Sequence, residues 1–416
     1  MNYDLVLHNI GTLVTCQGHA TPAKGEALKE AGIIYNCSVA INDGVIVLIA
    51  PGDDAPDLLK DAANSYDVGG RMLLPGFVDP HTHLVYAGDR SHEYDLKLQG
   101  VPYLEILRQG GGILSTVRQT RAASKEQLIR QSLGRLTNML RHGTTTAEVK
   151  TGYGLNTVTE LLQLQVIAEL SQNYPVELVA TFMPAHAIPP EFAQDRQGYI
   201  QLMITEMFPQ AKGLAAFCDV FCEEGVFTVP EARFILQAAQ NYGMRPKLHA
   251  DELSSGGGSQ LAAELKAISA DHLLQTDAEG IAAMAKAGVI GVCLPATSLN
   301  LAAGHYAPAR AMLEQGMAIA LASDVNPGSC PCDNMQLVIT LACLYLKLTP
   351  AEAIVAATIN AAHAIGMADK IGSIEVGKQA DFILCDIPNL AYLPYRFGLN
   401  HVQQVFKKGW LVRDNT

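Results

Sequence analysis

The chain has 416 residues, of which 49% are hydrophobic and 17% charged, and its formal net charge is −12 at pH 7. This length fits one (β/α)8 barrel with a small accessory domain, and the composition leaves little room for disorder. The acidic charge and the lack of a basic patch argue against a nucleic-acid partner. Because no segment offers about 18 consecutive apolar residues, the sequence predicts no membrane span.

The cysteines and the first residues indicate a compartment. Nine cysteines, an odd number, are scattered mostly through apolar segments, which is typical of reduced thiols and predicts a cytoplasmic protein. Residues 1–6 lack a basic stretch followed by an apolar one, so no signal peptide is expected. Cys330-Pro331-Cys332 has no partner pair nearby, and we interpret it as part of a loop.

Both terminal parts of the chain are rich in predicted strands. The first part carries them at residues 4–7, 12–14, 39–41 and 45–48, and Asn42-Asp43-Gly44 predicts a hairpin turn between the last two. The last part repeats the pattern at residues 372–378, 380–384, 402–406 and 410–412, with a turn at Lys408-Gly409. Neither part has enough apolar surface to fold alone, so we expect one composite β domain made of residues 1–73 and 369–416.

Between these parts, short apolar strands alternate with helical segments, as in parallel βα units. Eight strands are predicted, at residues 76–83, 144–150, 176–186, 217–223, 245–252, 267–273, 289–295 and 318–324. Helices are predicted at residues 125–141, 158–172, 230–242, 259–265 and 277–287. The pattern predicts an α/β fold with a closed (β/α)8 barrel over residues 74–368 and its chemistry at the C-terminal strand ends.

The first predicted barrel strand ends in His81-Thr82-His83. Because side chains alternate with period two along a strand, both imidazoles are expected on one face, where they can bind one metal ion. For this pair alone, the alternative is a strand end that happens to carry two histidines.

Polar side chains also fall at nearly every other predicted strand end: Glu148, Lys150, His186, Glu223, His249, Glu252, His272 and Asp324. His249 offers a third imidazole and Asp324 a carboxylate, and with His81 and His83 they suit Zn²⁺ or another divalent first-row ion. Taken singly, each histidine could equally be a hydrogen-bonded residue of the core or the rim. The set favours a metal site.

A metal in such a site lowers the pKa of its bound water to about 7. Asp324 could then accept the proton of the water, while His272 polarises a substrate carbonyl and Glu252 protonates a leaving nitrogen. The reaction class that these residues imply is the metal-assisted hydrolysis of a C–N bond.

Residues 75–83, together with His249, His272 and Asp324, resemble the amidohydrolase superfamily, as does the tail at residues 360–381. More specific segments resemble the imidazolonepropionase family within it, at residues 110–118, 148–155, 249–252, 269–273 and 323–328. This resemblance implies opening of the ring of 4-imidazolone-5-propanoate to N-formimidoyl-L-glutamate in histidine degradation. A metal-activated water would attack the ring amide carbonyl, and the resemblance also suggests a homodimer.

The resemblance further implies a role for individual positions. The implied metal ligands are His81, His83, His249 and Asp324, and the implied catalytic residues are Glu252, His272 and Asp324. The implied substrate and product contacts are Arg90, Tyr103, Tyr153, His186, Glu252, Asn326, Gly328 and Ser329. A guanidinium at Arg90 suits the propionate carboxylate, and tyrosines can wall a flat ring. From the residues alone, the alternatives are an ion pair of Arg90 with Asp89 or Glu93 and core packing for both tyrosines.

One metal per chain is predicted, either zinc or iron. Relatives with two metals place a modified lysine on the fourth barrel strand, whereas residues 217–224 contain none. Lys150 belongs to the second strand, and we interpret it as structural or as a loop anchor. The glycines at residues 110–112 predict a flexible loop over the pocket rather than a phosphate cradle, because no lysine follows at the P-loop spacing.

Two other functions stay open at this point. A deaminase of an aromatic heterocycle would share His81, His83, His249, Glu252, His272 and Asp324, and would differ in having no need of Arg90. A catalytically inactive barrel used in assembly is the other, although every proposed ligand and both proposed catalytic residues are present.

Overall fold

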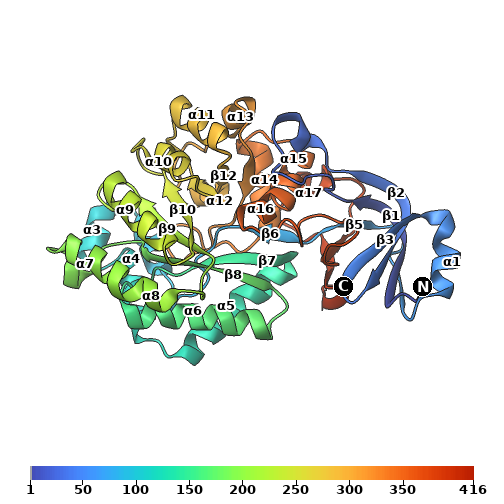
Figure 1. Ribbon diagram of the computed structural model, residues 1–416, viewed down its shortest axis with the longest axis horizontal. Helices are drawn as coiled ribbons and strands as arrows, with labels where there is room; N and C mark the ends of the chain where they lie inside the picture. The colour runs from blue at the N-terminus through green and yellow to red at the C-terminus, as the bar shows by residue number, and fades with distance from the viewer. Residues whose placement is uncertain (1) are drawn as a thin grey trace.

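The computed structural model describes residues 2–416, apart from the side chains of residues 53, 103, 104 and 107. Two sheets organise the chain (Figure 1): an eight-stranded parallel sheet curled into a nearly closed barrel, and a separate eight-stranded mixed sheet. The predicted fold class, a (β/α)8 barrel with a composite β domain, is confirmed.

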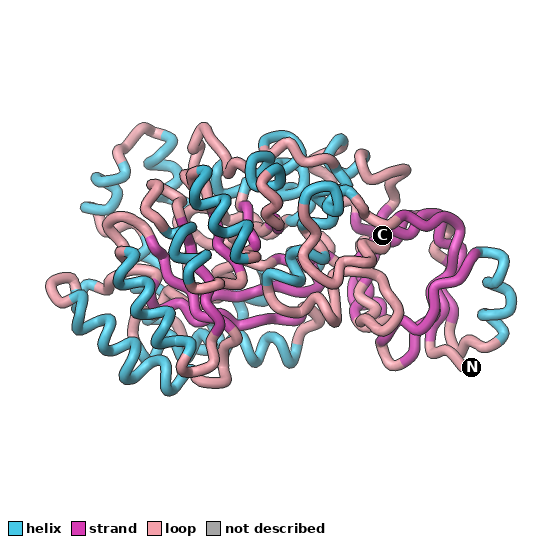
Figure 2. The backbone as a smooth tube through the Cα atoms, turned by 45° about the horizontal axis from the view of Figure 1, so that its top comes forward, coloured by secondary structure: helices cyan, strands magenta, loops and turns pink. Residues whose placement is uncertain are grey.

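The barrel strands follow one another in chain order and neighbouring strands are parallel. They are β6 (Phe77–Asp79), β7 (Thr144–Lys150), β8 (Glu177–Ala185), β9 (Phe217–Cys222), β10 (Arg245–Ala250), β11 (Ser269–His272), β12 (Ile290–Cys293) and β13 (Ile319–Leu321). Most of their residues are buried, because the inner face is filled by side chains and the outer face is covered by helices (Figure 2).

The helices fill the connections between the strands. In chain order they are α2 (Ser91–Leu98), α3 (Tyr103–Arg108), α4 (Ile113–Ala122), α5 (Lys125–Arg141), α6 (Thr157–Asn173), α7 (Arg196–Leu202), α8 (Phe208–Ala211), α9 (Val229–Gln240), α10 (Gly258–Glu264), α11 (Ala278–Ala287), α12 (Pro295–Asn300), α13 (Ala309–Glu314), α14 (Met335–Tyr345), α15 (Pro350–Ala356), α16 (Ile359–Ala364) and α17 (Tyr392–Tyr395). Ser124 and Gln127 form a capping box that fixes the start of α5 where the sequence predicts it. None of the helices within residues 2–416 is long and apolar enough to cross a membrane.

The seam of the barrel lies between β13 and β6, which share no ladder among the described residues. Asp79 bridges the seam, since its Oδ1 accepts the backbone N–H of Ser323 at 3.0 Å and its Oδ2 accepts the Ser323 hydroxyl at 2.5 Å. The backbone N–H of Asp324 donates to the carbonyl of His81 at 3.1 Å. The seam therefore closes directly beside the predicted metal ligands.

The mixed sheet joins the two ends of the chain. Its strands are β1 (Leu5–Val14), β2 (Ile33–Asn42), β3 (Val45–Pro51), β4 (Ser65–Asp67), β5 (Met72–Pro75), β14 (Phe382–Cys385), β15 (Val402–Lys407) and β16 (Trp410–Asp414). β14 pairs with β5 in antiparallel register, with Phe382 opposite Pro75. The short helix α1 (Ala55–Lys60) lies at the outer end of this sheet, far from the barrel (Figure 1).

Three strand predictions differ from the structure. The strands predicted at residues 4–7 and 12–14 form one strand, β1, with a register shift between Leu7 and Ile10 where Asn9 has a positive φ of 55°. Residues 372–378 are predicted as β structure, but they form turns and no strand, with Gly377 and Lys378 hydrogen-bonded to Ile46 of β3. β6 ends at Asp79, because Pro80 has no N–H to continue a ladder.

Candidate metal centre and active site

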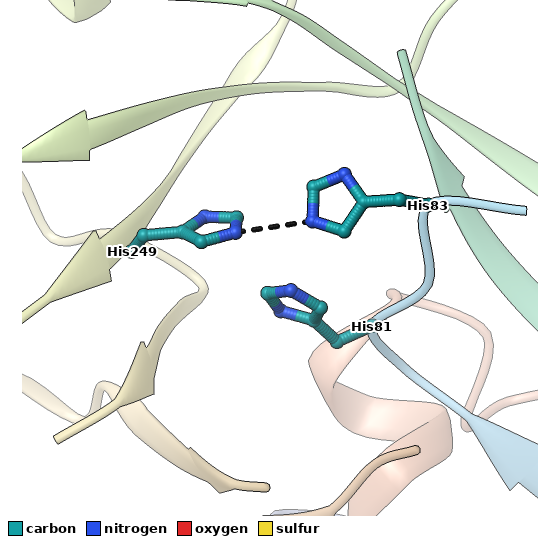
Figure 3. Close-up of side chains that lie close together, drawn as sticks. All are labelled: His81, His83 and His249. Carbon is teal, nitrogen blue, oxygen red and sulfur yellow. Dashed lines mark hydrogen bonds between the residues drawn. The ribbon is translucent and has the colours of Figure 1, made fainter. Parts of the chain in front are cut away.

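Four predicted ligands converge at the C-terminal end of the barrel. His81 and His83 lie in the extended segment after β6, His249 lies in β10, and Asp324 follows β13. The Nε2 atoms of His83 and His249 are 3.2 Å apart (Figure 3). Oδ1 of Asp324 is 3.4 Å from Nε2 of His81 and 3.8 Å from Nε2 of His83. All four side chains are at most 3% exposed, so solvent does not satisfy their polar atoms.

The segment that carries His81 and His83 is not a strand, yet it is fixed on both sides. Thr82 accepts the backbone N–H of Lys150 at 2.8 Å, and His83 donates its backbone N–H to Val325 at 2.9 Å. These hydrogen bonds to Lys150 and Val325 hold the segment so that the two imidazoles lie near one another, with ring centroids 5.3 Å apart. Both imidazoles thus reach one site, although not by the strand geometry that the sequence predicts.

The donor set fits a divalent metal ion. Nε2 of His81 is buried and has no hydrogen-bond partner among the described residues. Nε2 of His83 and Nε2 of His249 face each other. Burial, followed by the positive charge of neighbouring groups, lowers the pKa values of His81 and His83 well below the usual range, so both rings are neutral. Neutral imidazole nitrogens and one carboxylate oxygen are the ligands that Zn²⁺ and similar ions accept.

His249 differs from the other two histidines. Burial alone would lower its pKa, but the adjacent carboxylate of Asp219, at 3.1 Å from Nδ1, outweighs this and raises the pKa. A metal ion that binds Nε2 of His249 therefore competes with protonation of this ring. Metal binding at this site is expected to release protons.

Asp324 is oriented by a neighbour on α12. The hydroxyl of Thr297 donates to Oδ2 of Asp324 at 2.7 Å, which leaves Oδ1 on the side of His81 and His83. Burial raises the pKa of Asp324 to about 6, and the Thr297 hydrogen bond acts in the opposite direction. Near neutral pH the carboxylate is thus ionised but remains a proton acceptor of usable strength.

Glu252 and His272 lie beside the ligands, with Oε1 of Glu252 3.5 Å from Nδ1 of His272. Burial, and then the charge of Asp324, raises the pKa of Glu252 to about 8. Burial lowers the pKa of His272 well below its usual value. Glu223 holds this loop, because it accepts the backbone N–H of Glu252 at 3.1 Å. The site therefore pairs a protonated carboxylic acid with a neutral imidazole.

An aromatic wall lies on the other side of His83. The ring of His186 stacks on His83 with centroids 4.7 Å apart and planes 15° apart, and Tyr153 lies 5.3 Å from His186. Burial, and then the charge of His249, lowers the pKa of His186 to about 3, so this ring is neutral as well. Such a wall suits a flat, partly polar ring.

The loop that carries Tyr153 is organised by a buried carboxylate. Glu160 on α6 accepts the backbone N–H groups of Gly152, Gly154 and Leu155 at 3.1, 2.8 and 2.8 Å. The carbonyl of Gly152 lies 3.1 Å from Nδ1 of His186. Glu160 thus fixes the loop between two of the predicted substrate contacts.

Arg90 lies at the edge of the site and is paired. Its Nε and Nη2 donate to Oε2 of Glu93 at 2.9 and 2.8 Å, the ion pair that was the sequence-based alternative. The guanidinium also packs on Gly328, where an added Cβ would lie 2.0 Å from Nη1. Both residues line a cavity of about 390 Å³, which also includes Lys97. The side chain of Tyr103, another predicted contact, lies outside the described residues.

The turn after β13 contains the predicted product contacts Asn326, Gly328 and Ser329. Oδ1 of Asn326 accepts the backbone N–H groups of Gly328 and Ser329 at 2.9 and 2.7 Å. Its Nδ2 donates to the carbonyl of Asp324 and to the Ser329 hydroxyl, both at 2.8 Å. The amide of Asn326 is thus occupied within its own turn, and its hydrogen bonds shape the backbone beside Arg90.

Sequence reasoning did not single out the acids behind the ligands, Asp219 and Asp271, nor Thr297 and Glu160. A signal existed for the first two, because each is the one acid within a short, fully or largely buried strand, β9 or β11. A lone acid in a buried strand needs a partner, and here each faces a ligand histidine. Thr297 and Glu160 lie on helices and leave no such trace in the sequence.

A family model described as the amidohydrolase family matches residues 72–412. The chain belongs to the amidohydrolase family. This amidohydrolase is 51% identical to the imidazolonepropionase of Alkaliphilus oremlandii (strain OhILAs), over 99% of this chain and 98% of that protein. It is 47% identical to the imidazolonepropionase of Streptococcus pyogenes serotype M6, with the same coverage of 99% and 98%.

Solved structures share the fold of this amidohydrolase. The guanine deaminase of E. coli has a TM-score of 0.75 at 16% identity and covers 99% of each chain. An adenosine deaminase from Xanthomonas campestris, with bound zinc, has a TM-score of 0.71 at 22% identity and covers 99% of this chain and 93% of its own. At these identities the likeness describes the fold alone.

Proposed function

We propose that this protein is an imidazolonepropionase, which hydrolyses 4-imidazolone-5-propanoate to N-formimidoyl-L-glutamate in histidine degradation. The observation that carries the proposal is the convergence of His81, His83, His249 and Asp324 in a chain about half identical to curated imidazolonepropionases over its whole length. In this reaction water adds to the ring amide carbonyl, the carbonyl C–N bond breaks, and the nitrogen leaves with a proton.

The chain's own residues divide the work of that reaction. The three imidazoles and Asp324 would hold a divalent ion, which would lower the pKa of a bound water to about 7. Asp324, with its pKa of about 6, accepts a proton from the attacking water. His272, as a neutral ring, offers an N–H to the carbonyl oxygen as negative charge develops there. Glu252, protonated near pH 7, delivers the proton to the leaving nitrogen.

The remaining predicted contacts fit the two ends of the substrate. Tyr153 and His186 form the wall for the flat ring. Arg90 would hold the propionate carboxylate, since its Nη1 side faces Gly328 rather than Glu93. The ion pair with Glu93 holds the guanidinium of Arg90 in place. The Nη1 edge of the guanidinium is left to bind a second carboxylate, that of the substrate. A neutral heterocyclic base, the substrate of the alternative deaminase, would make no use of this group.

We further propose one metal per chain, zinc or iron, in a cytoplasmic homodimer. One metal is supported by a lysine-free β9 and by the two possible ligand groups among the described residues, His81–His83–His249 and His81–His272–Asp324, which overlap at His81. Metal analysis should return close to one equivalent in a fully active sample, and two equivalents would contradict the proposal.

The test is direct hydrolysis by purified, metal-replete protein. Freshly made 4-imidazolone-5-propanoate is mixed with the enzyme, and the loss of ring ultraviolet absorbance is followed with chemical identification of the product. We expect rapid formation of N-formimidoyl-L-glutamate, abolished by chelation and by Asp324→Ala. Decay at the spontaneous rate with metal bound would overturn the proposal and direct attention to deamination of heterocyclic bases.

A matched pair of arginine variants tests the orientation of the substrate. Arg90→Ala should raise KM strongly and leave the metal content unchanged. Arg233→Ala removes another arginine–carboxylate pair, with Glu264 at 2.8 Å on the helical surface, and should leave KM unchanged. Equal kinetics for the two variants would argue against a carboxylate-bearing substrate held by Arg90.

A further inference from the structure

Five charged side chains lie fully buried behind the metal ligands and have no part in the reaction proposed above. They come from the barrel strands β7, β9, β10 and β11, and all are 0% exposed: Glu148, Lys150, Asp219, Lys247 and Asp271. Burying an ion costs several kcal/mol unless close partners compensate it. Such a cluster of buried charges needs a structural or functional reason.

Lys150 is the centre of this cluster. Its Nζ lies 2.8 Å from Oε1 of Glu148, 2.8 Å from Oδ2 of Asp219 and 3.4 Å from Oδ2 of Asp271. An ammonium group has three N–H donors, and here three carboxylates surround it. Burial alone would lower the pKa of Lys150, but Asp219, Glu148 and Asp271 outweigh it and raise the pKa, so the side chain remains charged.

The two aspartates also face the metal ligands with the same oxygen atoms. Oδ2 of Asp271 is 2.6 Å from Nδ1 of His81, and Oδ2 of Asp219 is 3.1 Å from Nδ1 of His249. Oδ1 of Asp219 also accepts the backbone N–H of His249 at 3.0 Å. In both imidazoles Nδ1 is turned to a carboxylate, which leaves Nε2 to point at the common site.

We propose that Lys150 is a positioning residue of the metal centre, whose ammonium fixes the carboxylates of Asp219 and Asp271 so that these orient His249 and His81. The ligands come from β10 and from the segment after β6, which are not neighbours in the barrel. One cation on β7 thus sets the direction of two imidazoles from separate parts of the barrel. This inference rests on the proposed metal centre but not on the identity of the substrate.

Removal of the ammonium should weaken metal binding. In Lys150→Met the chain length is kept, while two buried carboxylates lose their shared donor and are free to turn away from Nδ1 of each histidine. Groups that orient a metal-bound histidine typically contribute 10–100-fold to metal affinity. We expect Zn²⁺ to bind Lys150→Met about 10–100-fold more weakly, in a competition titration with a chromophoric chelator.

Lys407 provides a matched control. It is also a buried lysine between two carboxylates, with Nζ 2.7 Å from Asp381 and 3.1 Å from Glu177, but it lies on β15 and touches no residue of the metal site. Lys407→Met should lower the melting temperature and leave Zn²⁺ affinity within threefold of the wild type. The absorption spectrum of bound Co²⁺, which reports ligand geometry, should change in Lys150→Met and not in Lys407→Met.

A folded Lys150→Met protein with wild-type Zn²⁺ affinity and an unchanged Co²⁺ spectrum would overturn the inference. If this variant does not fold, Asp271→Asn takes its place, because the amide keeps the shape while weakening the contacts with both Lys150 and His81. Wild-type Zn²⁺ affinity in Asp271→Asn would then overturn the inference. Wild-type protein that binds Zn²⁺ but does not open the ring would instead count against the proposed function alone.

Discussion

The hydroxyl of Thr297 holds Oδ2 of Asp324 at 2.7 Å and so decides which carboxylate oxygen faces the histidines. The contact is fully buried, and Thr297 comes from α12 rather than from a barrel strand. The helix after β12 thus orients a ligand that follows β13.

Thr297→Val tests this contact, since valine keeps the shape and removes the donor. Asp324 loses a hydrogen bond that opposes its protonation and is free to rotate, so we expect Zn²⁺ affinity to fall about tenfold or more. Thr297→Ser, which keeps the hydroxyl, is the control and should retain most of the affinity. Chelator competition measures both, and equal affinities for the two variants would refute the orienting role.

The pH dependence of the rate should report Glu252. As an acid with a pKa of about 8, it is protonated below that pH and loses its proton above it. We therefore expect kcat to fall by about tenfold per pH unit on the alkaline side of pH 8. A metal ion bound to Asp324 offsets part of the negative charge that raises the pKa of Glu252. The alkaline fall in kcat, the alkaline limb of the pH–rate profile, should therefore start at or slightly below pH 8.

Glu252→Gln should lower kcat by about 10²–10⁴-fold and abolish the alkaline limb while the metal content is kept. A limb that persists in Glu252→Gln at the same pH would assign it to another group.

Gly328→Ala should impair substrate binding rather than metal binding. Gly328 has an ordinary φ, so the conflict is purely steric, with the new Cβ 2.0 Å from Nη1 of Arg90. We expect the guanidinium to be displaced and KM to rise about tenfold or more, because the loss of one charge-assisted hydrogen bond costs about 1.5–3 kcal/mol. Gly256→Ala is the control, since its Cβ would meet nothing closer than 3.5 Å. Steady-state kinetics that do not distinguish the two variants would remove Gly328 and Arg90 from the site.

Removal of the metal should destabilise the barrel at its seam. His81 and His83 follow the first barrel strand and Asp324 follows the last, so a metal ion ties together two strands that share no ladder among the described residues. At a free Zn²⁺ concentration 100 times the Kd, binding stabilises the folded state by about 2.7 kcal/mol. Calorimetry with and without chelator should show this loss as a lower melting temperature. Asp324→Ala should show little dependence on Zn²⁺, and a full Zn²⁺ effect in that variant would place the ion elsewhere.

Much of the barrel could be predicted from the sequence, because the residues that define a strand or a helix end lie within the element itself. β7 and α5 have the predicted bounds, since β7 is rich in β-branched Thr and Val and Ser124 caps α5. β6 was predicted too long, because the prediction continued the strand through Pro80, which has no N–H for a ladder. The segment at residues 372–378 has a β-like composition but forms turns, and its backbone contact with β3 is limited to the hydrogen bonds of Gly377 and Lys378 with Ile46.

For the site, the residue types at the predicted strand ends indicated the metal ligands. The side chains that each of them would contact could not be predicted. His249 and Asp324 could be placed because each ends a predicted strand. The pairing of Arg90 with Glu93, the occupied amide of Asn326 and the position of Lys150 depend on which side chains meet across the barrel. Lys150 was interpreted as structural or as a loop anchor, whereas the structure places its ammonium among three carboxylates behind the ligands.

The pairing of β5 with β14 has a consequence for how the protein is made. Pro75 and Phe382 are opposite each other in the sheet, yet about 300 residues of chain separate them. At a synthesis rate of roughly 5–20 residues per second, β5 waits about 15–60 s on the ribosome before its partner emerges. During that time Leu73 and Leu74, which end up fully buried, have an open strand edge beside them. The nascent chain therefore carries an exposed apolar edge until nearly the last residues are translated, which makes early shielding of this edge a requirement for high yield.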